Sequence, residues 1–425
     1  WSPTDRTDVS LDFMYATYDV TQDFKTIEVL FRGNEPGMDV TSYTMETNPD
    51  RFGSGNNTLI AMDVDNAWVR SETYLQEQEN EFQQINLNFS HDFSDKWGIS
   101  GMLGTTENES TIPKETTLMY DDRAYDGYSY DYSGSTQYPV LAFNGLDVND
   151  GTIFQLSDVR DRPGYVENSF DAALLDIHWN ITDYYTLKGG FSYKKFDFYT
   201  TQSRRDTSVC GGGLYPCGEG EYGAPGTAEL SDAYVYPGRV GQGSNTTWAA
   251  PSLKGWTEYF DLYNLPANLN FGSNRAVEEE NTGYWIQLDG QHLFGNMDFY
   301  YNAGVRYIET EQQSSGWNSG VWVTVDRPKY DDTLPALNAA LWVTPELVIR
   351  GSWAETMSRP SLSQLSPGGS VDSFNYEIRY NNPFLDPTRS ENLDFSAEWY
   401  FAEEAVIALA WFQKDIESFP IRSSR

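Results

Sequence analysis

The feature that most constrains this fold is a hairpin unit that recurs from end to end of the chain. In its clearest copy, Asn392 to Lys414, apolar and polar residues alternate up to a polar turn, Ala402 to Ala405, and a second apolar stretch follows. A two-residue period is typical of a β-strand with one wet face. Five further copies bring the prediction to six hairpins and roughly twelve strands. Their predicted turns are Val20 to Asp23, Ser94 to Lys96, Thr182 to Tyr184, Gly295 with Asn296, and Thr344 to Glu346.

The connections alternate strictly between two lengths. Turns of a few residues alternate with polar connections that run from Gly33 to about Asn66, from about Glu107 to Glu167, and from about Gln202 to Glu279. Loops beyond about fifteen residues are uncommon in compact domains. Segregated short turns and long loops are typical of an up-and-down barrel in an outer membrane, with periplasmic turns and extracellular loops. We therefore predict an all-β, antiparallel transmembrane barrel portion, with one architecture over residues 1–425.

Aromatic residues flank the predicted turns, as the interfacial girdle of a membrane barrel does. Phe93 with Trp97 and Trp179 with Tyr184 are examples. Ordinary hydrophobic core at the hairpin ends is the alternative interpretation. Because the opposite parity of each strand is polar, we predict a wet lumen on that side. The residues predicted to face lipid are Val9, Leu11, Ile27, Val29, Ile85, Leu87, Leu175, Ile177, Phe299, Tyr301, Phe395 and Ala397.

Composition narrows the classes of partner and function. The chain has 28 basic and 63 acidic residues and a net charge of -35, which repels phosphate backbones and makes nucleic acid a poor partner. The sequence contains no run of about eighteen apolar residues, so no spanning helix is predicted. No Ser-His-Asp set, phosphate-binding glycine loop or metal-binding histidine pair stands out. We assign no catalytic site, no enzyme activity, no cofactor and no metal site.

The two cysteines predict a local disulfide. Cys210 and Cys217 are separated by six residues that include three glycines and a proline. A disulfide that pins such a loop implies an oxidising compartment, such as a periplasm or a cell surface. A zinc site is the alternative, and it would need two further ligands near these sulfurs.

Aromatic residues in the long connections are the candidate ligand contacts, because the C-H faces of sugar rings stack on indole and phenol rings. Packing within the loop is the alternative for each of them. In particular, the segment from Leu253 to Leu262 could form a short amphipathic helix that uses Trp256 and Phe260 to stay folded. The candidates are Tyr128, Tyr130, Tyr132, Trp248, Trp256, Tyr259, Trp317 and Trp322.

Two acidic groups raise the question of calcium, which takes oxygen ligands in flexible geometry. Their spacing does not match an EF-hand loop, so a solvated acidic surface is the favoured interpretation. The groups are Asp121, Asp122, Asp126 and Asp131, and Asp147 with Asp150.

The segment from Ser358 to Phe401 carries the most specific pattern in the chain. It contains SRPSLSQLSPGG and then NNPFLDPTRSENLDFSAEWYF, which closely resembles the barrel signature of TonB-dependent outer-membrane receptors. In that signature an Asn-Pro-x-Leu-x-Pro turn precedes Ser-x-Asn and a strand with an aromatic end. The matching residues are Asn382, Pro383, Leu385, Pro387, Ser390, Asn392, Glu398 and Phe401.

Other stretches resemble the proteobacterial branch of this family that is linked to oligosaccharide uptake. They are YSYDYSG at Tyr128, VRDRPGYVENSFD at Val159, LKGGFSYKKFDF at Leu187 and AGVRYIETE at Ala303. The resemblance implies a Gram-negative outer-membrane receptor that contacts lipid, binds a small solute, and is energised by TonB and its inner-membrane complex through a plug. The family's barrel has about 22 strands around that plug. The plug, the TonB-contacting box and the terminal strands cannot be matched here, so the resemblance implies a partial barrel.

Two alternatives from other classes remain open. A passive porin shares the strand alternation but needs no plug, so an N-terminal plug in the parent gene would reject it. A secreted all-β carbohydrate-binding protein or hydrolase would be soluble without detergent.

Overall fold

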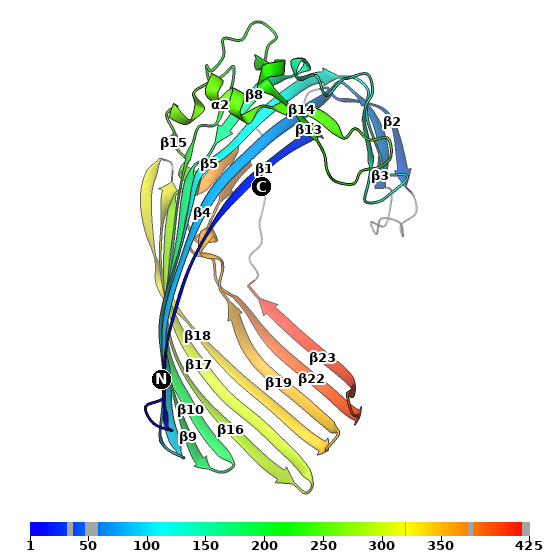
Figure 1. Ribbon diagram of the computed structural model, residues 1–425. Coiled ribbons are helices and arrows are strands. Elements are labelled where there is room, and N and C mark those ends of the chain that lie inside the picture. Colours follow the sequence, from blue (N-terminus) through cyan, green and yellow to red (C-terminus); the bar gives the residue numbers. More distant parts are fainter. Residues whose placement is uncertain (32–36, 47–57, 319, 373–376, 419–425) are drawn as a thin grey trace.

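The described residues form one large curved antiparallel sheet with smaller sheets at one end (Figure 1). The computed structural model describes residues 1–31, 37–46, 58–318, 320–372 and 377–418. Neighbouring strands of the main sheet follow the chain order, and β1 and β23 form its two edges in the described part of the chain. Its strands are β1 (Thr7–Val29), β4 (Ala67–Ser94), β5 (Trp97–Tyr125), β9 (Gly164–Thr182), β10 (Tyr185–Arg204), β16 (Arg275–Phe294), β17 (Met297–Asn318), β18 (Val321–Thr344), β19 (Leu347–Ser358), β22 (Thr388–Ala402) and β23 (Ala405–Glu417).

Five of the six predicted hairpins are confirmed. They join β4 to β5, β9 to β10, β16 to β17, β18 to β19 and β22 to β23, each antiparallel and each through a tight turn. Gly295 and Glu404 have positive φ values of 66° and 62° in two of these turns, a conformation that closes a tight hairpin. We call the end of the sheet that carries these turns the turn end and the opposite end the loop end.

The first predicted hairpin is wrong. Residues Thr7 to Val29 form one continuous strand that pairs with β4 along its whole length, so the predicted turn at Val20 to Asp23 lies opposite Gln78 to Leu75. The stretch is polar, but it contains no Gly or Pro to break a strand. The main sheet therefore runs through eleven consecutive strands in the described residues instead of the twelve expected.

Much of each predicted long connection is also strand. β4 and β5 contain 28 and 29 residues, whereas about 9–11 residues cross a membrane. β17 likewise extends to Asn318, and β18 begins at Val321. The middle stretches of β4 and β5, Gln76 to Asn80 and Thr105 to Ser110, are polar on both faces, so the alternation that marks a half-buried strand is missing from their sequence. Part of the predicted connection from Gly33 to Asn66 lies outside the described residues.

The register sorts the main sheet into two faces. Val9, Phe89, Gly101 and Leu175 form one cross-strand row, and Tyr301, Ala339, Gly351 and Phe395 form another on the same face. We call this face the outer face and the opposite one the inner face. Ten of the twelve residues predicted to face lipid share the outer face at the turn end: Val9, Leu11, Ile85, Leu87, Leu175, Ile177, Phe299, Tyr301, Phe395 and Ala397.

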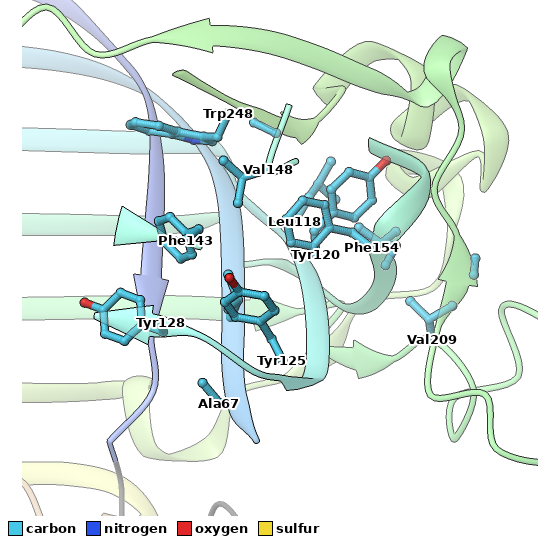
Figure 2. Packing of buried hydrophobic residues seen from close by; sticks show 14 of the residues in the cluster. Ala67, Leu118, Tyr120, Tyr125, Tyr128, Phe143, Val148, Phe154, Val209 and Trp248 are labelled. Atoms are coloured by element: carbon cyan, nitrogen blue, oxygen red, sulfur yellow. The ribbon is translucent and has the colours of Figure 1, made fainter. Parts of the chain in front are cut away.

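Ile27 and Val29 are the exceptions, because they pack partly buried against a hydrophobic cluster at the loop end. In this cluster, the loop-end core, Tyr120 stacks on Phe154 (Figure 2). Trp256 belongs to the same cluster and contacts the Tyr120 ring. The smaller elements between the long strands are β2 (Asp39–Glu46), β3 (Thr58–Asp65), β6 (Tyr128–Asp131), β7 (Val140–Phe143), η1 (Gly151–Ile153), β8 (Gln155–Asp161), β11 (Thr207–Ser208), β12 (Ala224–Pro225), η2 (Ala228–Leu230), β13 (Ser231–Val235), β14 (Thr247–Pro251), α2 (Leu253–Tyr259), η3 (Leu262–Asn264), β15 (Asn268–Leu269) and η4 (Phe271–Ser273).

α2 occupies the predicted helical stretch. Ser252 caps its N-terminus by accepting a hydrogen bond from the Gly255 N-H. Trp256, within the helix, is only 1% exposed. No helix of the described residues is long and apolar enough to span a membrane.

Candidate functional site

A row of polar side chains crosses six neighbouring strands on the inner face near the turn end. Thr186, Asp289, Asn302, Asn338, Ser352 and Asp394 are successive cross-strand partners. Asn338 Nδ2 donates to Asn302 Oδ1 at 2.8 Å, and Lys188 Nζ pairs with Asp289 Oδ2 at 2.6 Å. This row lines a hollow of about 660 Å³. Carboxylates and amides in lipid would cost several kcal/mol each, so this face suits a wet lumen.

Closer to the loop end, residues 359–372 and 377–387 lie against the inner face of β16, β17 and β18. We call them the inner segment. It contains η5 (Leu362–Gln364), β20 (Gly369–Asp372) and β21 (Glu377–Tyr380). The Gln312 side chain of β17 donates from Nε2 to the Pro383 carbonyl at 3.0 Å. The segment is therefore docked on the wall of the sheet.

Three arginines fasten the inner segment and the start of β22. Arg327 of β18 donates to the Leu385 carbonyl at 2.6 Å and to Asp386 Oδ1 at 2.7 Å. Arg359 donates to Thr310 Oγ1 at 2.9 Å and pairs with Glu279 at 3.4 Å. Arg389 of β22 pairs with Asp332 of β18. Hydrogen bonds between charged and polar groups are the stronger ones, so these contacts fix the position of the segment.

The wall beneath the segment is a buried polar network. Asn281 Nδ2 donates to Glu279 Oε1 at 2.9 Å, and Thr310 Oγ1 donates to Asn281 Oδ1 at 2.8 Å. Glu279, Thr310, Gln312 and Asp332 are each less than 9% exposed. Gln312 Oε1 and Asp332 Oδ2 are buried without a hydrogen-bond donor among the described residues. Buried acceptors are costly unless they are paired, so these two oxygens would accept hydrogen bonds from hydroxyl groups or water.

The family-motif residues explain why the segment docks there. Asn382 Oδ1 accepts from the Phe384 N-H at 2.9 Å, and Pro383 and Pro387 are buried. Proline has no N-H to satisfy, which suits a chain that is held to a wall by its carbonyls. The remaining motif residues hold the following strand: Leu385 gives its carbonyl to Arg327, Ser390 bonds Thr356, Asn392 donates to Thr356, Glu398 accepts from Arg350, and Phe401 packs on Trp399.

The predicted aromatic contacts do not come together in one site. Tyr128, Trp248 and Trp256 are 6%, 5% and 1% exposed in the loop-end core, where burial raises the pKa of Tyr128 to about 12. Their packing is what the alternative interpretation expected. The more accessible residues are Tyr130 and Tyr132, which contact each other on β6 and the turn after it, Tyr259 at the end of α2, and Trp317 and Trp322 at the tip of the β17–β18 hairpin.

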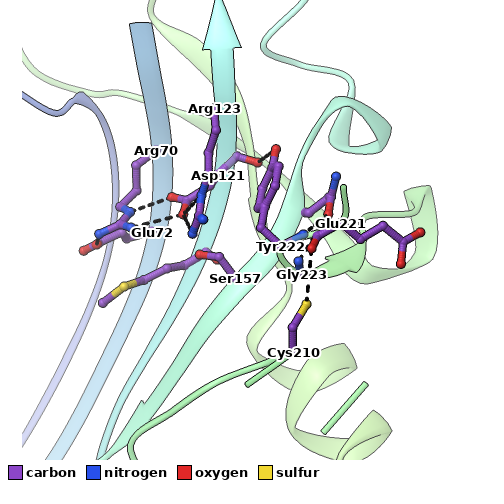
Figure 3. Close-up of polar contacts among 11 residues, drawn as sticks. Arg70, Glu72, Asp121, Arg123, Ser157, Cys210, Glu221, Tyr222 and Gly223 are labelled. Carbon is purple, nitrogen blue, oxygen red and sulfur yellow. Dashed lines mark hydrogen bonds and ion pairs between the residues drawn. The ribbon is translucent and has the colours of Figure 1, made fainter. Parts of the chain in front are cut away.

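Asp121 corrects the expectation of a solvated acidic surface (Figure 3). Its carboxylate is 0% exposed and accepts from Arg70 Nε at 2.7 Å and from Arg123 Nη2 at 3.1 Å. The Arg123 guanidinium lies over the rings of Trp68 and Tyr222, and burial raises the pKa of Tyr222 to about 12. One carboxylate of this acidic stretch is therefore buried, and two arginines compensate its charge.

The other acids of that group are accessible or serve local roles. Asp126, Asp131, Asp147 and Asp150 are exposed, and Asp122 is partly exposed. Asp150 caps η1, and hydrogen bonds from the Thr152 hydroxyl and N-H lower its pKa. Within the described ranges, no group of three or more His, Cys, Asp or Glu residues is arranged to hold a metal ion.

Cys210 and Cys217 form a disulfide with a Cα–Cα distance of 5.5 Å. It closes a small loop beside β8, where the Val209 N-H donates to the Ser157 carbonyl at 2.7 Å.

The residues that sequence reasoning missed are the wall partners of the inner segment, Gln312, Arg327 and Asp332. The family motif marks the segment itself, but its partners on the wall lie far away in the sequence. Arg327, for example, is 58 residues from Leu385. No local spacing connects such residues.

Residues 114–425 match the protein family described as TonB dependent receptor-like, beta-barrel. No curated protein matches the sequence.

Several solved structures are similar to this chain at low identity. The closed form of the ferric-catecholate import receptor Fiu from Escherichia coli is 11% identical, with 97% of this chain and 57% of that chain covered and a TM-score of 0.42. The ferric preacinetobactin receptor BauA from Acinetobacter baumannii is 10% identical, with 97% and 55% covered and a TM-score of 0.36. A double mutant of the hemophore receptor HasR from Serratia marcescens, in complex with HasA and heme, is 9% identical, with 98% and 56% covered and a TM-score of 0.35. The chain spans somewhat more than half the length of these proteins.

Proposed function

We propose, for a chain that belongs to the TonB-dependent receptor β-barrel family, that it supplies about half of the membrane barrel and part of the solute-binding wall of an import receptor. Proteins of this family lie in the outer membrane of Gram-negative bacteria. In this proposal the turn end faces the periplasm and the loop end faces the outside of the cell. The outer face at the turn end would contact lipid. The inner face would line the path of the solute.

We further propose that the solute is a neutral oligosaccharide. The observation that carries this proposal is the chemistry of the inner face, where amide and hydroxyl groups recur at Thr186, Asn302, Asn338 and Ser352. A wall that offers many neutral donors and acceptors favours a solute with many hydroxyl groups, because a solute lacking them would leave buried polar groups unpaired. The net charge of -35 also disfavours strongly anionic solutes.

The energising partner in this proposal is TonB with its inner-membrane complex, which would act through a plug domain of the whole receptor. The resemblance to the oligosaccharide-uptake branch supports the solute class, and the family match supports the coupling. Wall residues such as Asp289 and Asn338 would then face either plug or solute as the plug moves.

Binding to the intact receptor in detergent tests the solute class. Isothermal titration with maltoheptaose, cellohexaose, xylohexaose and chitohexaose is expected to give saturable binding for at least one of them, with a dissociation constant of about 1 μM or lower, or roughly -8 kcal/mol. The component monosaccharides serve as the control, because they should bind much more weakly. Binding of a ferric chelate that none of the sugars competes with would contradict the proposal.

A further inference from the structure

The inner segment presents an alternating strip of side chains away from the wall. Tyr380 and Phe384 are 69% and 53% exposed, and Asn382 and Asp386 between and after them are exposed as well. The intervening Pro383 and Pro387 are buried, and Leu385 is half-buried. The side of the segment that faces away from the sheet therefore carries, in order, an aromatic ring, an amide, an aromatic ring and a carboxylate. We call these four residues the aromatic strip.

The backbone that carries the strip is held rigidly. The Asn381 N-H donates to the Gly368 carbonyl, the Asn382 N-H to the Gln364 carbonyl, and the Leu385 N-H to the Asn382 carbonyl, at 3.1, 3.1 and 3.3 Å. Asn381 Nδ2 also donates to Ser366 Oγ at 2.9 Å. From the wall, Gln312 and Arg327, themselves buried, hold the Pro383 and Leu385 carbonyls.

This combination of rigid backbone and exposed rings needs an explanation. A single exposed aromatic residue is ordinary on a protein surface, and a mobile loop can expose one at little cost. Here two rings are held on the lumen side of a segment whose other side is anchored through a buried polar network. Rigid elements that present accessible rings and polar groups are how binding sites hold ligands with little loss of conformational entropy.

The chemistry of the strip matches a sugar chain. Each ring offers a flat apolar face for the C-H face of a pyranose, and the two rings are separated by a residue with hydrogen-bonding capacity. Asn382 uses its Oδ1 for the Phe384 N-H, which leaves the amide hydrogens of Nδ2 for hydroxyl oxygens. Asp386 gives Oδ1 to Arg327 and can accept from a hydroxyl at Oδ2. Stacking faces that alternate with hydrogen-bonding groups can contact the rings and the hydroxyl groups of a sugar chain at the same time.

We propose that the aromatic strip, Tyr380, Asn382, Phe384 and Asp386, is a binding site for consecutive sugar rings of the solute. The inference rests on the proposed function and specifies where on the wall the oligosaccharide would be held. The buried acceptors Gln312 Oε1 and Asp332 Oδ2 belong to the network that supports the strip and play no direct part in the contact.

The test uses the intact receptor and whichever oligosaccharide of the panel above binds the wild type most tightly. The Tyr380→Ala/Phe384→Ala double variant is expected to raise its dissociation constant at least tenfold, while Tyr380→Phe/Phe384→Tyr, which keeps both ring faces, stays near the wild-type value. Tyr43→Ala is the matched control, because Tyr43 is 66% exposed on β2 and lies outside the strip. It should bind like the wild type.

A Phe384→Cys variant gives a second readout that does not depend on the double variant folding. Its thiol is expected to react quickly with a polar maleimide in the free receptor and to be protected when the sugar is added. If the wild type binds a sugar and the double variant binds it equally well, or if Cys labelling is unaffected by sugar, the strip is not the site while the proposed function stands. If the wild type binds no sugar of the panel, the solute class falls and the inference falls with it.

Discussion

Replacing Asp121 with alanine is expected to destabilise the loop end by about 3–5 kcal/mol, the usual cost of leaving a buried charge without its partner. Asp121 is fully buried, and its carboxylate accepts from Arg70 Nε at 2.7 Å and Arg123 Nη2 at 3.1 Å. Arg70 is 5% exposed, so water cannot replace the lost carboxylate. The buried guanidinium would keep only the longer ion pair with Glu72, at 3.7 Å. The local unfolding free energy can be read from hydrogen exchange of β4 and β5 amides in the intact receptor.

The control for this prediction removes both partners. Arg70→Met/Asp121→Leu replaces the Arg70–Asp121 pair by apolar side chains of similar size and should be much less damaging than Asp121→Ala, because both fully buried charges are removed together. The remaining partners, Arg123 and Glu72, are partly exposed. Exchange rates in the Asp121→Ala variant that equal those of the wild type would show that the pair is solvated, contrary to the structure.

An arginine at position 175 is expected to cost about 2–4 kcal/mol of folding free energy in lipid, whereas the same arginine at position 176 should cost much less. Leu175 lies on the outer face in a cross-strand row with Gly101 and Phe191. Asp176 is its neighbour in sequence and lies on the inner face opposite Gly190. Since successive side chains of a strand point to opposite faces, the two variants introduce the same arginine at nearly the same depth but on opposite faces of the sheet.

The measurement is reversible urea unfolding of the intact receptor in lipid vesicles, with wild type, Leu175→Arg and Asp176→Arg compared at one lipid composition. The comparison is informative in both directions. Equal costs at the two positions, or a larger cost at position 176, would mean that the outer face does not contact lipid.

Sequence patterns predicted the part of the fold where hydrophobic alternation is strong. The turns at Gly295 with Asn296 and at Ala402 to Ala405 follow directly from polar or glycine breaks between half-buried strands. The pattern failed at Val20 to Asp23, where a polar stretch continues as strand because Gln78 to Leu75 pair with it. Pairing between polar residues leaves no hydrophobic period in either strand, so it could not be read from one chain.

The candidate site was predictable only in part, for a related reason. The motif at Asn382 to Pro387 marked the inner segment, but the arginines and the glutamine that hold it come from distant strands. Burial also separates aromatic residues that look alike in sequence. Trp256 is 1% exposed in the core, whereas Phe384, which no sequence argument singled out, is 53% exposed on an anchored backbone. The family is established by the match over residues 114–425, and the oligosaccharide remains a proposal.

Uptake of a radiolabelled oligosaccharide by cells that carry the intact receptor separates energy-coupled sugar import from passive passage. We expect saturable uptake of a sugar that binds the purified receptor. We also expect loss of that uptake in cells without TonB or treated with a protonophore, while surface binding persists. Equal uptake with and without TonB would make the protein a passive channel. Import of a ferric chelate with no uptake of any sugar would contradict the proposed solute.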